Sequence, residues 1–87
     1  MLITTHQPAT YRYRIDHTPG FRTDLVVERL DDGEWIEVPG SRAEFPALIV
    51  AQDYCRSMLR VHKASGAFSE TRDEAGNLRL TSQSVTI

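Results

Sequence analysis

The chain is poor in several features whose absence excludes whole classes of protein. Cys55 is the single cysteine among 87 residues, so neither an intrachain disulfide nor a cysteine-based zinc site can form. The formal net charge of −2 argues against a general electrostatic attraction to nucleic acid. No apolar run is long enough to cross a bilayer, and the first residues lack the pattern of a signal peptide. We therefore expect a cytoplasmic protein with no membrane contact.

Groups that carry catalysis or bind metals are also scarce. The five glycines occur singly in turns, without the clustered spacing of a phosphate-binding loop. His6, His17 and His62 are too far apart to place two metal ligands on one helix face. Cys55 falls on the apolar stripe of the expected helix, where burial raises a thiol pKa and makes the sulfur a poor nucleophile. The sequence thus predicts no enzyme activity, no metal, no cofactor and no small-molecule substrate.

Three extended segments are expected before residue 40. From 11 to 16, apolar and charged residues alternate, which is the period of a strand with one buried face. Segments 24–30 and 34–38 are separated by Asp31-Asp32-Gly33, whose residues tolerate the positive φ of a tight hairpin turn. Both faces of 24–30 carry apolar side chains. We place Leu25 and Val27 inside, with the pair Val26 and Leu30 as the alternative.

The segment Ser41–Gly66 is predicted to contain the only long helix. Ser41 and Glu44 have the spacing of a capping box, although Pro46 delays the regular helix to about residue 45. Basic residues in the last turn, followed by Gly66 as a left-handed stop, mark its expected end.

A second hairpin is expected after the helix, with segments 67–72 and 78–87 flanking a turn at 73–77 and one strand at an edge. The last four residues, 84–87, either complete this sheet or add to the sheet of another protein. The sequence therefore predicts one α+β domain over 1–87, flexible in about its first nine residues, with an antiparallel sheet in β-β-β-α-β-β order packed on one central helix. The expected core side chains are Tyr13, Ile15, Leu25, Val27, Ile36, Val38, Phe45, Leu48, Ile49, Cys55, Leu59 and Phe68.

The expected helix carries more apolar surface than one buried face requires. Its core stripe consists of Phe45, Leu48, Cys55 and Leu59. A second stripe, roughly opposite the first, consists of Val50, Tyr54 and Val61. This second stripe needs a cover, which is either the chain's own terminal segments or another protein. Trp35 shares a strand face with Glu37, so an outward-facing indole is a further candidate for a contact.

These features favour a non-catalytic protein-binding module. Its contact surface includes Val50, Tyr54 and Val61, with Trp35 as an addition, and its partner is a larger assembly or a second copy of the chain. Small chains of this kind are typical of inhibitors and regulators of larger assemblies, for example the anti-CRISPR proteins of phages and mobile elements.

The alternative is a nucleic-acid-binding module that uses arginines on the outer face of the first strands. Its residues are Arg12, Arg14 and Arg22. This hypothesis requires that the three arginines share one exposed surface with no carboxylate among them, because interleaved carboxylates repel phosphates.

Overall fold

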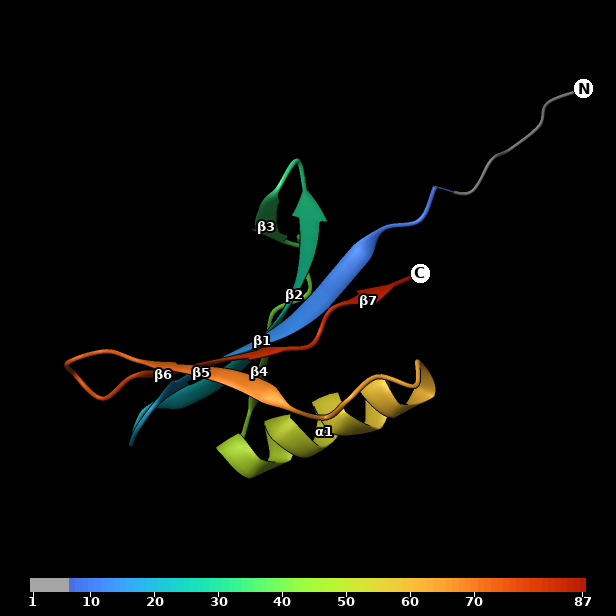
Figure 1. Ribbon diagram of the computed structural model, residues 1–87. Coiled ribbons are helices and arrows are strands. Elements are labelled where there is room, and N and C mark those ends of the chain that lie inside the picture. The colour runs from blue at the N-terminus through green and yellow to red at the C-terminus, as the bar shows by residue number, and fades with distance from the viewer. Residues whose placement is uncertain (1–6) are drawn as a thin grey trace, which may run out of the picture.

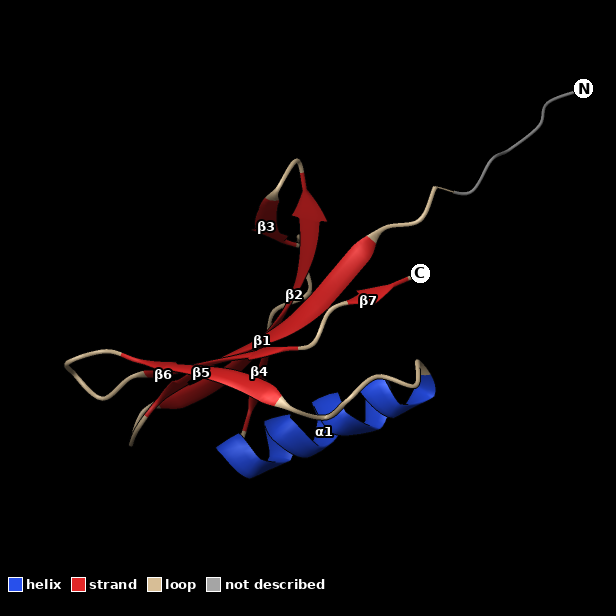
Figure 2. Ribbon diagram, in the orientation of Figure 1, coloured by secondary structure: helices blue, strands red, loops and turns tan. Residues whose placement is uncertain are grey.

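The structure is a computed structural model that describes residues 7–87. Its elements are β1 (Thr10–Thr18), β2 (Arg22–Asp31), β3 (Glu34–Glu37), β4 (Ala43–Phe45), α1 (Leu48–Val61), β5 (Phe68–Arg72), β6 (Leu78–Ser82) and β7 (Val85–Thr86). The strands form one antiparallel sheet in the order β3-β2-β1-β6-β5, with β4 paired to β2 and β7 to β1. Helix α1 lies against one face of this sheet (Figures 1 and 2). The predicted small α+β fold is therefore confirmed, with β4 and β7 as two short strands that were not expected as separate elements.

The hairpin of β2 and β3 turns at the predicted residues. Asp32 and Gly33 both have positive φ, 50° and 81°, which matches the right-handed twist of the two flanking strands. The pairing of β1 with β2 places Ile15 opposite Leu25, so these two side chains share the face that α1 covers.

The predicted start of the helix is wrong. Ala43–Phe45 forms β4, and Ser41 caps no helix: its Oγ accepts a hydrogen bond from the Val27 N–H (3.1 Å) and donates one to the Val27 carbonyl (3.3 Å). The reason is that β3 pairs only with the second half of β2, which leaves the edge at residues 23–25 free for β4. Helix α1 begins at Leu48, behind Pro46.

The predicted helix end is also shifted. Helix α1 ends at Val61, and the left-handed residue after it is Lys63, with φ of 57°. Gly66 serves a different purpose, because a Cβ built there would lie 3.0 Å from Cγ of Arg56. The alkyl chain of Arg56 therefore packs directly on the Gly66 backbone as the chain enters β5.

The second hairpin is confirmed, with β5 at the edge of the sheet. The C-terminal residues complete the chain's own sheet, since β7 pairs with the start of β1. Ile87 and Ala9 exchange two backbone hydrogen bonds of 2.9 Å each. The expected flexibility of the first nine residues falls mostly outside the described part of the chain, and Ala9 within it is tied to the last residue.

The core lies between α1 and the middle of the sheet. It is built from Ile15, Leu25, Ala51, Cys55, Leu78 and Leu80, with Leu59 also buried and Tyr13, Phe45, Leu48 and Phe68 packed at its border. Two predicted core residues, Ile36 and Ile49, are exposed. Ile36 lies on β3 at the edge of the sheet, and Ile49 lies in the first helical turn on the side away from the sheet. For β2, each of the two alternatives placed apolar side chains inside on one face only. The structure buries Leu25 on one face and Val26 on the other.

Candidate functional site

An open apolar groove lies between the sheet and the end of α1. Its volume is about 200 Å³, and its walls come from the start of β1, from β2, from the end of α1 and from β7. The apolar lining residues are Tyr11, Tyr13, Val27, Leu59, Val85 and Ile87, and His62 stands at the helix end. We call this feature the apolar groove. It forms where the sheet diverges from the last turn of α1, and β7 continues the line of β6 along β1 (Figure 1).

The predicted second stripe of α1 is exposed at the surface. Val50, Tyr54 and Val61 retain 42%, 44% and 73% of their accessible surface, so the terminal segments within 7–87 do not cover them. We call these three residues the helix stripe. The stripe flanks the core side of the helix more than it opposes it, because Tyr54 and buried Cys55 are only one residue, or about 100°, apart.

Tyr54 joins this surface to the core. Its ring centroid lies 5.5 Å from that of Phe45 and 6.4 Å from that of Tyr13, the latter in an edge-to-face arrangement. Burial, with smaller contributions from Tyr54 and Cys55, raises the pKa of Tyr13. The phenol of Tyr13 therefore stays protonated at neutral pH, and the aromatic group forms a rigid wall between the helix stripe and the sheet.

Cys55 lies in the core, as predicted. The side chain is fully buried, and burial raises the pKa of its thiol to about 12. A thiol that stays protonated at neutral pH is a poor nucleophile. Cys55 therefore contributes packing under the helix stripe.

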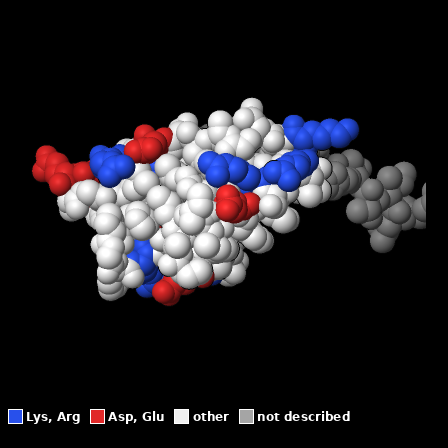
Figure 3. Space-filling view, turned by 90° about the horizontal axis from the view of Figure 1, so that it is seen from below, with Lys and Arg blue, Asp and Glu red and all other residues white. Residues whose placement is uncertain are grey.

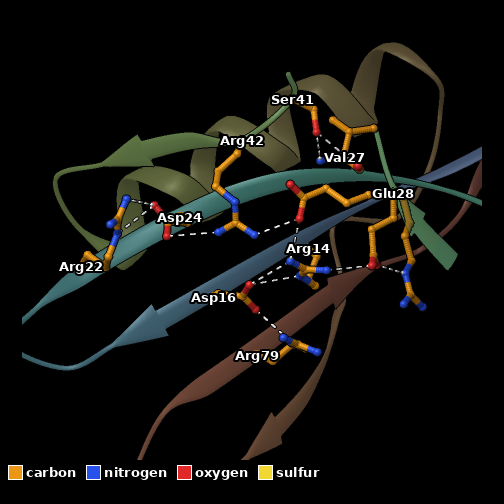
Figure 4. Close-up of polar contacts among 11 residues, drawn as sticks. Arg14, Asp16, Arg22, Asp24, Val27, Glu28, Ser41, Arg42 and Arg79 are labelled. Carbon is orange, nitrogen blue, oxygen red and sulfur yellow. Dashed lines mark hydrogen bonds and ion pairs between the residues drawn. The ribbon is translucent and has the colours of Figure 1, made fainter. Parts of the chain in front are cut away.

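The opposite face of the sheet carries a connected ion-pair network (Figure 4). It joins five arginines, Arg12, Arg14, Arg22, Arg42 and Arg79, to five carboxylates, Asp16, Asp24, Glu28, Glu37 and Glu44. Glu28 is 5% exposed and accepts hydrogen bonds from Arg12 (2.8 Å) and Arg14 (2.9 Å). Val26 is fully buried on this same face.

The network bears directly on the nucleic-acid alternative. Arg12 and Arg14 share Glu28, and Arg22 contacts Asp24 at 3.0 Å. The condition that no carboxylate lies among these three arginines is therefore not met. Their positive charge is already neutralised within the chain, which weakens any attraction to a phosphate backbone.

Trp35 lies on this charged face. In the pairing of β2 with β3 it shares a face with Glu28, and the guanidinium carbon of Arg12 sits 4.3 Å from its ring centroid. The indole is thus partly covered by the chain's own arginine. Because α1 lies on the other face, Trp35 and the helix stripe lie on different surfaces of the molecule. The sequence had suggested Trp35 as an addition to the same contact surface.

Sequence reasoning missed the apolar groove altogether. Tyr11 and Val85 were visible as members of alternating segments, but only their pairing in the sheet places them together. It also missed Phe21, which is 77% exposed in the turn between β1 and β2. The signal for Phe21 was its position directly after Pro19-Gly20, where a turn leaves a side chain without neighbours.

Residues 7–87 contain no cluster of histidine, cysteine or acidic side chains that could hold a metal ion. In the same part of the chain, no helix is long and apolar enough to pass through a membrane. Comparison of the chain with protein-family models, with curated proteins and with solved structures yields no match, so its function has to be argued from the groove, the stripe and the charged face.

Proposed function

We propose that this chain is a non-catalytic protein-binding module whose contact surface combines the apolar groove and the helix stripe. One observation carries the proposal: an open apolar groove of about 200 Å³ is lined by Tyr13, and the ring of Tyr13 contacts Tyr54 of the exposed helix stripe. Contiguous exposed apolar surface is unusual on a protein that acts alone, and it typically marks an interaction site.

The size of the groove favours a protein partner over a small molecule. Sites for small molecules usually enclose roughly 300–1,000 Å³, which is more than this groove offers. A groove of about 200 Å³ suits an apolar side chain presented by another protein, in the way that anchor residues enter pockets at interfaces.

Charge near the groove indicates the character of that partner. Arg60, His62 and Lys63 stand at the end of α1, next to the groove lining. Seen from below, several basic side chains lie near one another toward the end where the grey residues begin, with an acidic side chain beside them and uncharged surface around them (Figure 3). An apolar anchor flanked by acidic residues is the complementary ligand, because the cations steer such a segment toward the groove.

The finer proposal is a small inhibitor or regulator of a larger assembly, of the kind to which anti-CRISPR proteins belong. A rigid sheet that fixes the position of a small apolar surface suits this role, since little conformational entropy is lost when the surface is covered. In this proposal the charged face stays outside the interface.

Affinity capture with matched variants tests the proposal. The test variant is the double substitution Val61→Ser, Ile87→Ser, which removes exposed apolar groups at the stripe and at the groove. The control is Phe21→Ser, which removes an equally exposed apolar side chain at the opposite end of β1. Tyr54 is left intact because it supports Phe45 and Tyr13.

We expect the wild type and Phe21→Ser to capture the same partner from the native host, and the double variant to retain less than about a tenth of it. All three proteins should unfold within about 0.5 kcal/mol of one another, because exposed substitutions cost little stability. Equal capture by the double variant, or loss of capture in the Phe21→Ser control alone, would contradict the proposal.

A further inference from the structure

The helix stripe has the spacing of a helix-pairing seam. Val50, Tyr54, Ser57 and Val61 follow one another at steps of four, three and four residues, and all four are exposed. This is the spacing of the a and d positions at which one helix packs along another. We propose that the occupant of the stripe is a second copy of this chain, bound through two antiparallel α1 helices. The inference rests on the proposed function, because it names the partner of one part of the same surface.

Side-chain size favours the antiparallel register. When α1 is set against a second α1 running the other way, Val50 faces Val61 of the second copy at both ends of the seam. Tyr54 then faces Ser57 of the second copy in the middle, so that a large ring meets a small side chain. Such alternation of large and small residues allows two helices to interlock.

Charge complementarity selects the same arrangement. Asp53 and Arg60 lie seven residues apart on one flank of the seam, and both are exposed, Asp53 with 68% of its side chain accessible. In an antiparallel pair these flanking positions meet each other across the two-fold axis. Asp53 of each copy therefore faces Arg60 of the other, and the favourable contact is made twice. Asp53 also lies 3.5 Å from Arg56 of its own helix, a contact that holds the carboxylate on this flank.

The other flank of the seam disfavours a parallel pair. Its positions are occupied by Ala51, which is fully buried, and Met58, which is half-buried against the chain's own body. In a parallel pair Asp53 would face Met58 of the second copy, and Arg60 would face a position beyond the end of α1, so neither charge would meet a charged side chain of the second helix. The antiparallel arrangement is the one in which both charges are matched.

The seam is short, so the dimer is weak. It spans little more than three helical turns, and interfaces of this size bury less than about 1,200 Å² in total. We expect a dissociation constant on the order of 10–100 μM, measurable by sedimentation equilibrium of the full chain.

Charge exchange between the two copies provides the test. Asp53→Arg places two arginines opposite each other at both contacts, and Arg60→Asp places two aspartates there. Each variant alone should dimerise at least about tenfold more weakly than the wild type. An equimolar mixture of the two variants should recover the wild-type affinity as a heterodimer, because every arginine then faces an aspartate. The double variant Asp53→Arg, Arg60→Asp should also recover it.

The control is Glu70→Arg on β5, an exposed charge reversal away from α1 that should leave the affinity unchanged. A wild type that stays monomeric at the highest concentration overturns the inference, as does a mixture that fails to recover. In that case loss of the captured partner in the Val61→Ser, Ile87→Ser variant would still support the proposed function. Conversely, if the mixture recovers the affinity but the Val61→Ser, Ile87→Ser variant captures its partner as well as the wild type does, the dimer is supported and the proposed function is contradicted.

Discussion

Glu28 is the residue on which the charged face depends. It is almost fully buried, and it joins Arg12 to Arg14 through hydrogen bonds of 2.8 and 2.9 Å. A buried carboxylate is tolerated only when its charge and its hydrogen bonds are satisfied, and two guanidinium groups satisfy both. Loss of this carboxylate would leave two partly buried cations side by side without their shared counter-ion.

We predict that Glu28→Gln lowers the free energy of unfolding by about 2–3 kcal/mol. Breaking a fully buried pair costs about 3–5 kcal/mol, and the partial exposure of both arginines reduces the cost here. Urea denaturation followed by circular dichroism measures the change. Glu70→Gln is the matched control, because its pair with Arg72 is exposed and should contribute less than about 0.5 kcal/mol. Equal losses in the two variants would show that the Glu28 pair is no stronger than a surface contact.

Among the elements, the β2–β3 turn fixes how β3, the edge strand, pairs with β2. Asp32 and Gly33 adopt left-handed backbone conformations, which glycine adopts freely, which aspartate and asparagine tolerate, and in which most other residues are strained. Nothing lies within 4 Å of a Cβ built on Gly33, so a substitution there is penalised by the backbone alone.

We predict that Gly33→Ala lowers the free energy of unfolding by about 1–2 kcal/mol. Asp32→Asn, at the adjacent left-handed position, should change it by less than about 0.5 kcal/mol, since asparagine tolerates that conformation well. Chemical denaturation of both variants gives the comparison. If Gly33→Ala proved as stable as the wild type, the turn would have to adopt a conformation with negative φ at this residue.

At the scale of the whole molecule, the two faces of the sheet have opposite chemistry. On one face the charges are satisfied within the chain by the network centred on Arg14 and Glu28. On the other, α1 covers only part of the apolar surface and leaves the groove and the stripe open. This asymmetry is why we assign partner binding to the α1 side.

The network should also make the free energy of unfolding depend on pH. Hydrogen bonding from Arg42, with the charges of Arg42 and Arg14, holds the pKa of Glu37 below its ordinary value. A carboxyl group with a lowered folded-state pKa stabilises the fold above its unfolded-state pKa, and this contribution disappears as the pH falls through the folded-state value.

We predict that the wild type melts above Glu37→Gln at neutral pH and that the difference vanishes between about pH 5 and pH 2. Thermal melts across this range measure it. The pKa of Asp73 is also lowered, chiefly by a backbone hydrogen bond from Asn77. Asp73→Asn is therefore a control: its melting temperature should also approach that of the wild type in acid, whether or not Glu37 is present. A wild-type advantage over Glu37→Gln that persists below about pH 2 would mean that ionisation of Glu37 does not stabilise the fold.

Local patterns were sufficient for several elements, but not for β4 or for the ends of α1. Alternation of apolar and charged residues predicted β1, Asp31-Asp32-Gly33 predicted the hairpin turn, and apolar spacing placed Cys55 and Leu59 on the buried side of one helix. Each of these features depends on residues that are close in sequence, so the printed order of amino acids contains the information. The same periodicity placed Val50, Tyr54 and Val61 off the buried stripe. Whether the terminal segments cover them was left open, and the tertiary structure shows that they are exposed.

Tertiary structure decided which distant residues meet, and this determined the site. Ser41 could cap a helix or bond to Val27, and it does the latter because β2 has a free edge. Arg12 could reach solvent or a phosphate, but pairing of β1 with β2 places Glu28 beside it. The apolar groove needs β7 beside β1, at opposite ends of the chain. Contacts across such separations depend on strand register and on the space left by α1, which local sequence preferences do not specify.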